Sequence, residues 1–511
     1  MKKIINLCLL ALSFALITSC DRGFDDLNKS KTGATSLDPA LVLNNAVISS
    51  SFPGGTLTYE LPIVQQLFSS NSGVLAGGNY NQINITNTQV IWQNYFQNVI
   101  KYTKDVIIRT KDDPKRSNLM NMARIVQANA FIIVTDTYGD IPYTEAGVGY
   151  SSQVFFPKYD AQQSIYPNII QELTDASAAL DPAGKIETAD ALYSGNIAQW
   201  KKLGYSLLLR AGMRLGKADA ATAKTAVNTA VTGGVITSNS DNAYIKHDAN
   251  YNNGIGATLN TTEAANFYLA EPFVTALKNN SDPRLPAIAI RYVGAKSGPD
   301  QILSGSKANG TSVPSDQYGM PMGSDDAAAQ AAAVTLGIGS RYAFSQVDRT
   351  RMASKVAPMF LVTAAQSNLL LAEATQTGMI TGGSTAVQYF NAGIKAHMDQ
   401  MAIYNPNSAV APSDRDTYAS ARTGVFAGNE LQEINYEYWI ASFLNGPEAW
   451  ANFRRSGFPV LAPNPYPGRT VLFITRLTYP SSEILVNSAN VQAAIANMGG
   501  DNLDTKVWWN K

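Results

Sequence analysis

The chain has 511 residues, of which 45% are hydrophobic and 15% are charged. That apolar fraction is enough for a large core and excludes a wholly disordered chain. Lys plus Arg and Asp plus Glu are equal at 39 each, which argues against the basic surface of a nucleic-acid-binding protein. Length alone suggests about three domains.

Cysteine and histidine are scarce. The chain contains Cys8, Cys20, His247 and His397. These residues cannot supply a zinc site with the usual ligand set, and we predict neither a metal nor another cofactor. A catalytic cysteine–histidine pair is disfavoured, because Cys8 lies in a segment that we expect to be removed.

The first residues have the features of an export signal. Two lysines precede a mostly apolar stretch at 4–17, which is too short to span a membrane. The following Ile17-Thr18-Ser19-Cys20 resembles a bacterial lipobox, in which the cysteine is lipidated and becomes the new N-terminus. We therefore expect a signal peptide at 1–19, lipid attachment at Cys20, and an anchor and tether over 20–45. The alternative is an ordinary signal peptide that is cut elsewhere.

The middle of the chain has the 3.6-residue period of amphipathic helices, at 119–133, 165–180 and 199–215. Ser164 is expected to cap the second of these helices, with Pro167 at its third position.

A pair of helices is expected further along the chain. Thr363 and Gln366 have the spacing of a capping box, and Gly378 supplies a stop. A second helix over 384–402 completes a helical hairpin of the kind that stacks in tetratricopeptide arrays. Asn429–Gln432 is expected to open a last helix.

Long irregular stretches separate the helices, and loops of this length are usually functional or disordered. They are rich in Gly, Asn, Ser and Tyr. Aromatic faces bury the apolar face of a sugar, while amides pair with its hydroxyl groups. Asn is also a common turn former, which is the structural alternative. The candidate ligand-binding residues are Asn79, Tyr80, Tyr251, Asn252, Tyr268, Tyr292, Tyr318 and Tyr342.

Other motifs favour structural roles over catalytic ones. We interpret Tyr138–Tyr143 as a helix-ending turn rather than a ligand loop. Glu448 with Arg454 and Arg455 is interpreted as an ion-pair cluster, and His397 as a core residue with satisfied hydrogen bonds.

Several further segments stand in a fixed order along the chain. They are Phe24–Asn28, Ala130–Ala146, Pro157–Asp160, Trp200–Arg214, Leu371–Ala374, Asn445–Trp450, Phe453–Pro459, Arg476–Pro480 and Trp508–Trp509. Together they resemble the SusD/RagB family of outer-membrane nutrient-binding lipoproteins.

The resemblance implies a mainly α-helical fold of tetratricopeptide-like hairpins with long loop insertions, forming one domain over 46–511. It implies lipid anchoring to the outer membrane, facing the cell exterior. Such a protein captures an oligosaccharide and passes it to a SusC-like TonB-dependent barrel transporter, without catalysis.

Three alternatives stay open. The first is a lid of the same transporter type that captures a peptide, and the second is a purely structural lid. The third is a secreted helical glycosidase, which needs only two acids at a suitable separation.

Overall fold

A computed structural model of the protein describes residues 37–261, 266–301 and 310–511. The chain divides into two units, Met1–Asp38 and Pro39–Lys511, and the helices and strands of the described residues all belong to the second unit. The expected signal peptide and the lipid site at Cys20 lie outside the described residues. Helix α3 (Pro39–Ser49) already contributes buried residues to the core, although it begins within the range expected for the tether.

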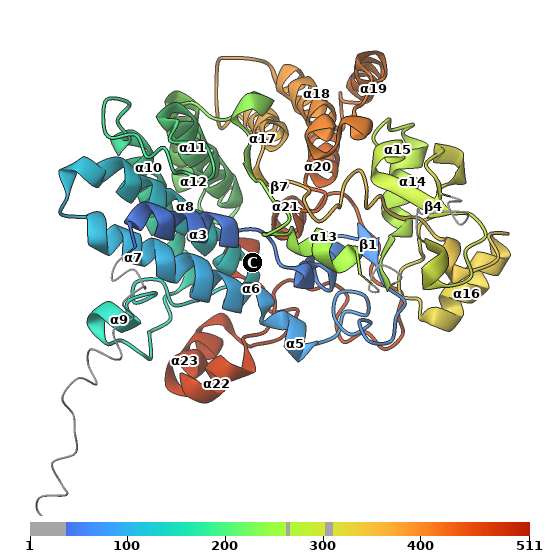
Figure 1. Ribbon diagram of the computed structural model, residues 1–511, viewed down its shortest axis with the longest axis horizontal. Coiled ribbons are helices and arrows are strands. Elements are labelled where there is room, and N and C mark those ends of the chain that lie inside the picture. Colours follow the sequence, from blue (N-terminus) through green and yellow to red (C-terminus); the bar gives the residue numbers. More distant parts are fainter. Residues whose placement is uncertain (1–36, 262–265, 302–309) are drawn as a thin grey trace, which may run out of the picture. The chain divides into compact units, whose positions relative to one another are not determined.

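The first part of this unit is a series of packed helices (Figure 1). Helix α7 packs on α8, α8 on α10, α10 on α11 and α11 on α12, so each long helix contacts the next. The bounds are η1 Gly54–Leu57, α4 Glu60–Ile63, α5 Ile85–Thr88, α6 Val90–Asn94, the π-helix η2 Tyr95–Ile100, α7 Lys101–Thr110, η3 Pro114–Arg116, α8 Ser117–Tyr138, α9 Gly149–Ser152, α10 Gln162–Ala179, α11 Ile197–Arg214 and α12 Ala220–Gly233.

The last part is also helical, and its first two helices are the expected hairpin. The Thr363–Gln366 capping box is present in both directions, and Gly378 has the left-handed φ of 71° that favours glycine. The bounds are α17 Ala364–Gln376, α18 Ala386–Tyr404, η10 Pro406–Ser408, α19 Pro412–Gly424, α20 Glu430–Ala441, α21 Gly446–Ser456, α22 Ser481–Val486, α23 Ser488–Met498 and η11 Trp508–Asn510.

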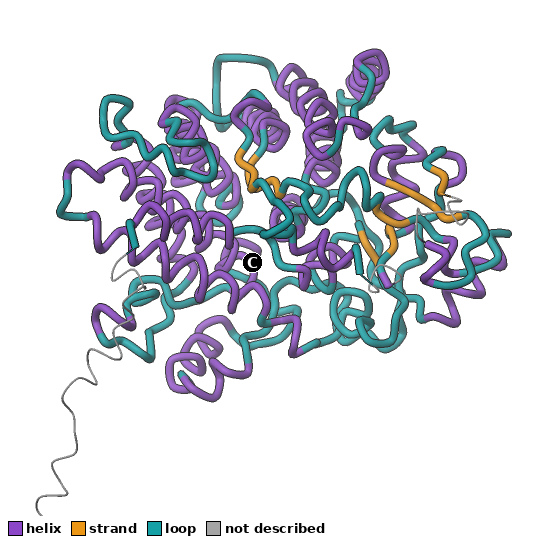
Figure 2. The backbone as a smooth tube through the Cα atoms, in the orientation of Figure 1, coloured by secondary structure: helices purple, strands orange, loops and turns teal. Residues whose placement is uncertain are grey.

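Between the helical parts, short strands and loops predominate (Figure 2). Strand β1 pairs with β3, β2 with β7, and β4 lies between β5 and β6; all these pairs are antiparallel. The bounds are β1 Leu67–Phe68, η4 Asn239–Asp241, β2 Ala243–Ile245, α13 Gly254–Leu259, β3 Tyr268–Leu269, α14 Glu271–Asn279, α15 Leu285–Ile288, β4 Ala289–Tyr292, η6 Gly298–Gln301, β5 Gly310–Thr311, η8 Pro314–Asp316, α16 Asp326–Thr335, η9 Arg341–Ala343, β6 Gln346–Val347 and β7 Met359–Val362.

Two expected helix boundaries are wrong. Helix α10 begins at Gln162, so Ser164 is not its cap and Pro167 lies deeper in the helix than its third position. The cap comes from a distant residue instead: Asp140 Oδ1 accepts the Gln162 N–H at 2.8 Å. The helix at Asn429–Gln432 is α20, and it is not the last one, because α21, α22 and α23 come after it.

The Tyr138–Tyr143 segment is the scaffold turn that the sequence predicts. Gly139 ends α8 with a φ of 84°. Asp140 then bonds α10 through its Oδ1 and α23 through its Oδ2, which accepts the Asn497 amide at 2.6 Å.

A buried ion network joins the central helices. Arg214 of α11 donates to Asp136 of α8 at 3.1 Å and to Glu448 of α21 at 2.8 Å. The indole N–H of Trp509 reaches the same Asp136 at 2.8 Å, which docks the C-terminal residues on the helices. Glu448 therefore belongs to a structural ion cluster, but its partners are Arg210 and Arg214. The expected pairing with Arg454 and Arg455 is wrong, because Arg455 pairs with Glu373 and Arg454 donates to the carbonyls of Asp136 and Thr475.

A second buried network joins α14 and α15 to the later helices. Arg284 is fully buried and pairs with Asp282 and with Glu437 of α20. Its Nη1 also donates to Nδ1 of His397 of α18 at 2.9 Å, and His397 is buried in the core, as predicted. Burial and the neighbouring guanidinium hold the pKa of His397 well below its usual value.

Candidate functional site

Two tyrosines from opposite ends of the chain form an aromatic pair beside α16. The rings of Tyr80 and Tyr466 stack with centroids 3.5 Å apart and an interplanar angle of 8°. Tyr80 is only 6% exposed, whereas Tyr466 is half-buried. The accessible surface of this pair therefore belongs mainly to Tyr466.

Polar groups surround the aromatic pair. Arg341 pairs with Asp326 at the start of α16, and Ser70 Oγ donates to the same carboxylate at 2.8 Å. Arg341 also lies 4.6 Å from the centroid of the Tyr342 ring and donates to its hydroxyl group. We call the five residues Tyr80, Asp326, Arg341, Tyr342 and Tyr466 the platform.

Neighbouring loops fix the platform in place. Asn79 is fully buried: its side chain accepts from Ser69 N at 2.9 Å and donates to Val74 O at 2.8 Å. Asn464 donates to the Asn79 carbonyl at 2.6 Å, which joins the Tyr80 loop to the Tyr466 loop. Asn79 thus holds the site together from below the surface.

Gly323 allows a third loop to approach the pair. A Cβ atom at this position would lie 2.9 Å from the Tyr466 backbone nitrogen, and the φ of 74° also favours glycine. The loop then leads into α16, whose N-cap Asp325 accepts the Ala328 N–H at 2.8 Å.

The environment of the platform keeps the Tyr80 hydroxyl group protonated. Burial, followed by the charges of Asp325 and Asp326, raises the pKa of Tyr80 to about 12. The hydroxyl group is thus protonated at neutral pH. The Asp326–Arg341 pair is partly exposed, so it retains accessible hydrogen-bonding groups. An aromatic face beside such groups can stack a sugar ring and bond its hydroxyls.

Tyr268 and Tyr292 point into the protein. Their side chains are 0% and 1% exposed, respectively. The Tyr268 hydroxyl accepts from Gln301 at 3.1 Å, and the Tyr292 hydroxyl accepts from Arg349 at 2.9 Å. The amide of Gln301 also donates to the Tyr342 carbonyl at 2.8 Å. These buried tyrosines therefore lie behind the platform and support Tyr342.

Tyr318 lies between two cations. Lys278 Nζ is 5.0 Å from its ring centroid, and the Arg291 guanidinium is 5.3 Å from it. Beside Lys278 a groove of about 310 Å³ is lined largely by Pro283, Pro286 and Pro314 with neighbouring residues. This volume is near the lower limit for a ligand site.

Tyr251 and Asn252 belong to another region. Both are exposed, and the Tyr251 hydroxyl donates to Ile48 O at the end of α3. The Tyr251 ring stacks on His247 with centroids 5.4 Å apart. The structure therefore brings Tyr80 and Tyr342 together but places Tyr251 and Asn252 elsewhere.

His247 forms a hydrogen bond with a serine. Its Nδ1 donates to Tyr251 O at 3.1 Å, which leaves Nε2 to accept the Ser51 hydroxyl at 2.9 Å. Burial lowers the pKa of His247, so it is neutral at pH 7. However, Ser51 lies just after the C-terminal end of α3, where the helix dipole is negative and opposes a developing oxyanion.

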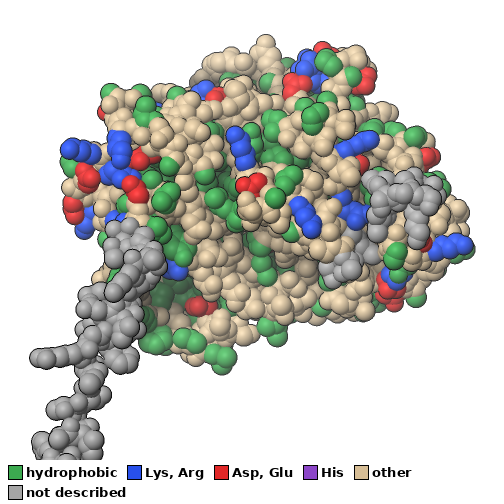
Figure 3. All heavy atoms as spheres, in the orientation of Figure 1, with side chains coloured by type: hydrophobic (Ala, Val, Ile, Leu, Met, Phe, Trp, Pro, Cys, Tyr) green, Lys and Arg blue, Asp and Glu red, His purple; other side chains and the backbone are tan. Residues whose placement is uncertain are grey.

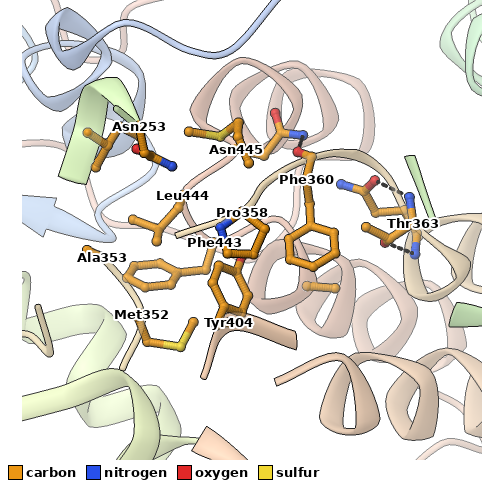
Figure 4. A pocket seen from close by; sticks show the side chains of 14 residues that line it. Asn253, Met352, Ala353, Pro358, Phe360, Thr363, Tyr404, Phe443, Leu444 and Asn445 are labelled. Atoms are coloured by element: carbon orange, nitrogen blue, oxygen red, sulfur yellow. Dashed lines mark hydrogen bonds between the residues drawn. The ribbon is translucent and has the colours of Figure 1, made fainter. Parts of the chain in front are cut away.

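A cavity lies among Phe360, Tyr404 and Phe443 (Figure 4). Its free volume is about 10 Å³, which suffices for about one water molecule. Asn445 donates to the Phe360 carbonyl at its edge. The cavity is too small for a sugar and does not compete with the platform as a ligand site.

Neither a metal site nor a membrane-spanning helix is found in the described part of the chain. Among those residues, no group of three or more His, Cys, Asp or Glu side chains is arranged to hold a metal ion. None of the described helices is both long and apolar enough to cross a membrane.

Sequence reasoning missed Tyr466, Asp326 and Arg341. Tyr466 lies in a long loop and is flanked by Pro465 and Pro467. Prolines restrict the backbone, so this pattern could have indicated an ordered aromatic residue. The Asp326–Arg341 pair spans 15 residues, and nothing in its spacing marks it.

The SusD-like_2 family model, described as "Starch-binding associating with outer membrane", matches residues 36–480. Among solved structures, a chitin-binding protein is 29% identical, with a TM-score of 0.80 over 93% of this chain and 100% of that chain. A SusD-like protein of Bacteroidetes AC2a is 26% identical, with a TM-score of 0.78 over 93% of this chain and 100% of that one. None of the curated proteins matches the sequence.

A third structure supports the fold alone. A chitin-binding SusD homolog from Flavobacterium johnsoniae is 23% identical, with a TM-score of 0.72 over 93% of this chain and 98% of its own. The helical architecture is thus shared with these proteins, and the mainly α fold class is confirmed. Since the family model covers most of the sequence, the chain belongs to the SusD-like family.

Proposed function

We propose that this protein binds an oligosaccharide at the platform and passes it to a SusC-like TonB-dependent transporter of the outer membrane. The observation that carries the proposal is the stacked Tyr80–Tyr466 pair beside the Asp326–Arg341 ion pair. A lipid on Cys20 holds the protein at the outer surface of the membrane, and the ligand leaves it uncleaved.

The chemistry of the platform supports a sugar ligand. The half-buried Tyr466 offers an aromatic face, and the partly exposed carboxylate and guanidinium can each bond neighbouring hydroxyl groups. Because the 29% identical relative is a chitin-binding protein, chitin oligosaccharides are the first ligands to test.

The environment of Ser51 and His247 supports binding without catalysis. Their hydrogen bond provides a hydroxyl group and a neutral base. The helix end beside them carries partial negative charge, which is the wrong sign for stabilising an acyl-transfer intermediate. We therefore assign the pair a structural role.

Calorimetry with chitin oligosaccharides tests the binding site. Tyr466→Ala is expected to weaken binding at least about ten-fold, because stacking on an aromatic anchor is lost. Tyr389, which is half-buried on α18, is the matched control, and Tyr389→Ala should leave the affinity unchanged. If a folded Tyr466→Ala variant binds the oligosaccharide with unchanged affinity, the platform is not the ligand-binding site. Binding of peptides but of no glycan would favour the peptide-capturing alternative.

Two further measurements test the other parts of the proposal. The masses of the oligosaccharides should be unchanged after long incubation, and shortened products would instead indicate a glycosidase. Cys20→Ala should move the protein from the membrane to the soluble fraction. Copurification with a barrel transporter encoded beside it would support the transfer step.

A further inference from the structure

An exposed apolar patch lies apart from the ion networks of the core. We define it as Tyr150, Phe155, Phe156, Leu485 and Val486, whose exposed fractions are 97%, 64%, 59%, 79% and 66%, respectively. Large apolar side chains that gather at the surface mark sites of contact with a protein or a membrane. Figure 3 shows hydrophobic side chains at the lower edge of the molecule, over the region of α22 and α23.

Specific hydrogen bonds hold the two halves of the patch together. Asn487, which comes directly after α22, donates to the Pro157 carbonyl at 2.8 Å, and Asn490 of α23 donates to the Phe156 carbonyl at 3.1 Å. The Tyr159 hydroxyl donates to Glu483 at 2.9 Å. The apolar side chains are therefore displayed on a fixed backbone.

The two segments that carry the patch contain no charged residue. Residues 146–157 and 484–500 contain no Asp, Glu, Lys or Arg, although 15% of the whole chain is charged. Ser, Asn and Gln are the polar residues there, and they keep hydrogen-bonding groups available at an interface. None of the five patch side chains is charged, so burying them in lipid desolvates no ion of their own, although Glu145, Lys158 and Glu483 border the patch.

The patch lies partly within the range of the family model, which includes Tyr150, Phe155 and Phe156. The family model ends at residue 480, so Leu485 and Val486 lie beyond the matched range. The platform is also separate from it, since the patch is carried by α9, its loop and α22.

We propose that the apolar patch inserts into the outer leaflet of the membrane that carries the lipid anchor. The proposal rests on the proposed anchoring at Cys20. Eighteen residues, 21–38, separate Cys20 from the start of α3, and even fully extended they reach only about 60 Å. Helix α3, with which the second unit begins, packs on α7, and Gly147 of the patch loop lies against Lys104 of the same helix α7.

Tethering makes a small patch sufficient. A lipid anchor on a short tether keeps the local lipid concentration high, so weak insertion of a few aromatic and aliphatic side chains becomes stable. Two membrane contacts at different points of the protein also fix its orientation, which one lipid anchor alone cannot do. The patch would then determine which face of the protein is oriented toward the transporter.

A dye at position 485 tests the insertion directly. Cys20 would be acylated in the mature chain, so Leu485→Cys supplies one reactive thiol on the full lipidated protein. Val334→Cys on α16, where the native side chain is 63% exposed, is the matched control. The labelled proteins are reconstituted in vesicles of phosphatidylethanolamine and phosphatidylglycerol containing a doxyl-labelled lipid.

Quenching at residue 485 is expected to exceed quenching at residue 334 by at least about two-fold. Equal quenching at both positions overturns the proposal. Quenching at residue 485 that occurs only when the transporter is added overturns it as well. The mass of the purified chain reports acylation independently. The mass therefore tests the lipid anchor and the quenching tests the patch contact, so the failure of one can be distinguished from the failure of the other.

Discussion

A single carboxyl group shows how the interior of this protein responds to pH. Glu60 is 2% exposed, and Gly446 at the start of α21 permits its close approach, since a Cβ there would lie 2.8 Å from the Glu60 Cβ. Burial raises the pKa of Glu60 to about 7, although the charge of Arg454 acts in the opposite direction. The folded protein therefore favours the protonated form of this side chain.

The raised pKa predicts that Glu60 lowers stability at alkaline pH. Below pH 4.5 the Glu60 carboxyl group is protonated in both the folded and the unfolded protein, so it does not lower the free energy of unfolding. The loss of stability grows as pH rises towards about 7. Glu60→Gln should raise the free energy of unfolding by up to about 3 kcal/mol above that range and by little below it. Urea unfolding across this pH range measures the effect.

An exposed acid provides the control for Glu60. The Asp112 side chain is 88% exposed, so Asp112→Asn should leave the pH dependence of stability as it is. If Glu60→Gln and the native protein have the same pH dependence, Glu60 is not the titrating group.

At the scale of elements, ion networks join helices that are distant in the sequence. Arg284 lies in the turn before α15, yet its partners Glu437 and His397 lie on α20 and α18. All three side chains are buried. The network therefore holds the region that carries the β4 sheet against the helical hairpins.

Breaking the Arg284 network should be costly. Arg284→Met leaves two buried carboxylates, Asp282 and Glu437, without their cation, and should lower the free energy of unfolding by about 3–5 kcal/mol. Arg415→Met on α19 removes a surface pair with Asp399 and should cost less than about 1 kcal/mol. Urea denaturation compares the two, and equal losses would contradict the assigned role.

At the scale of the whole molecule, one large hydrophobic cluster runs through most of the described unit, and two small clusters lie around α16 and β4. The large cluster extends from Ala40 in α3 to Trp509 near the C-terminus. Trp509 also bonds Asp136 of α8, so the final residues close the central network. The expectation of three domains from length alone does not fit this continuity.

This continuity predicts a single cooperative unfolding transition. Unfolding followed by tryptophan fluorescence and by far-UV circular dichroism should coincide, because tryptophans such as Trp200 and Trp450 lie in the same core as the helices. A separate early loss of helical signal would show that one part of the unit unfolds on its own.

Local features of the fold can be predicted from the sequence. The capping box at Thr363, the stop at Gly378 and the turn after Tyr138 depend on residues within a few positions of one another. The apolar face of α18 correctly placed His397 in the core. Such features can be predicted from the amino-acid sequence because helix periodicity and capping involve residues within one or two turns of each other.

The candidate site and the cap of α10 depend on contacts between segments that are distant in the sequence. Tyr80 and Tyr466 stack across nearly four hundred residues, and Asp140 caps α10 in place of the expected Ser164. Tyr268 and Tyr292 resemble the other loop tyrosines in sequence, yet they are buried. Stacking and burial depend on which segments the packed helices bring together, and no local pattern encodes that choice.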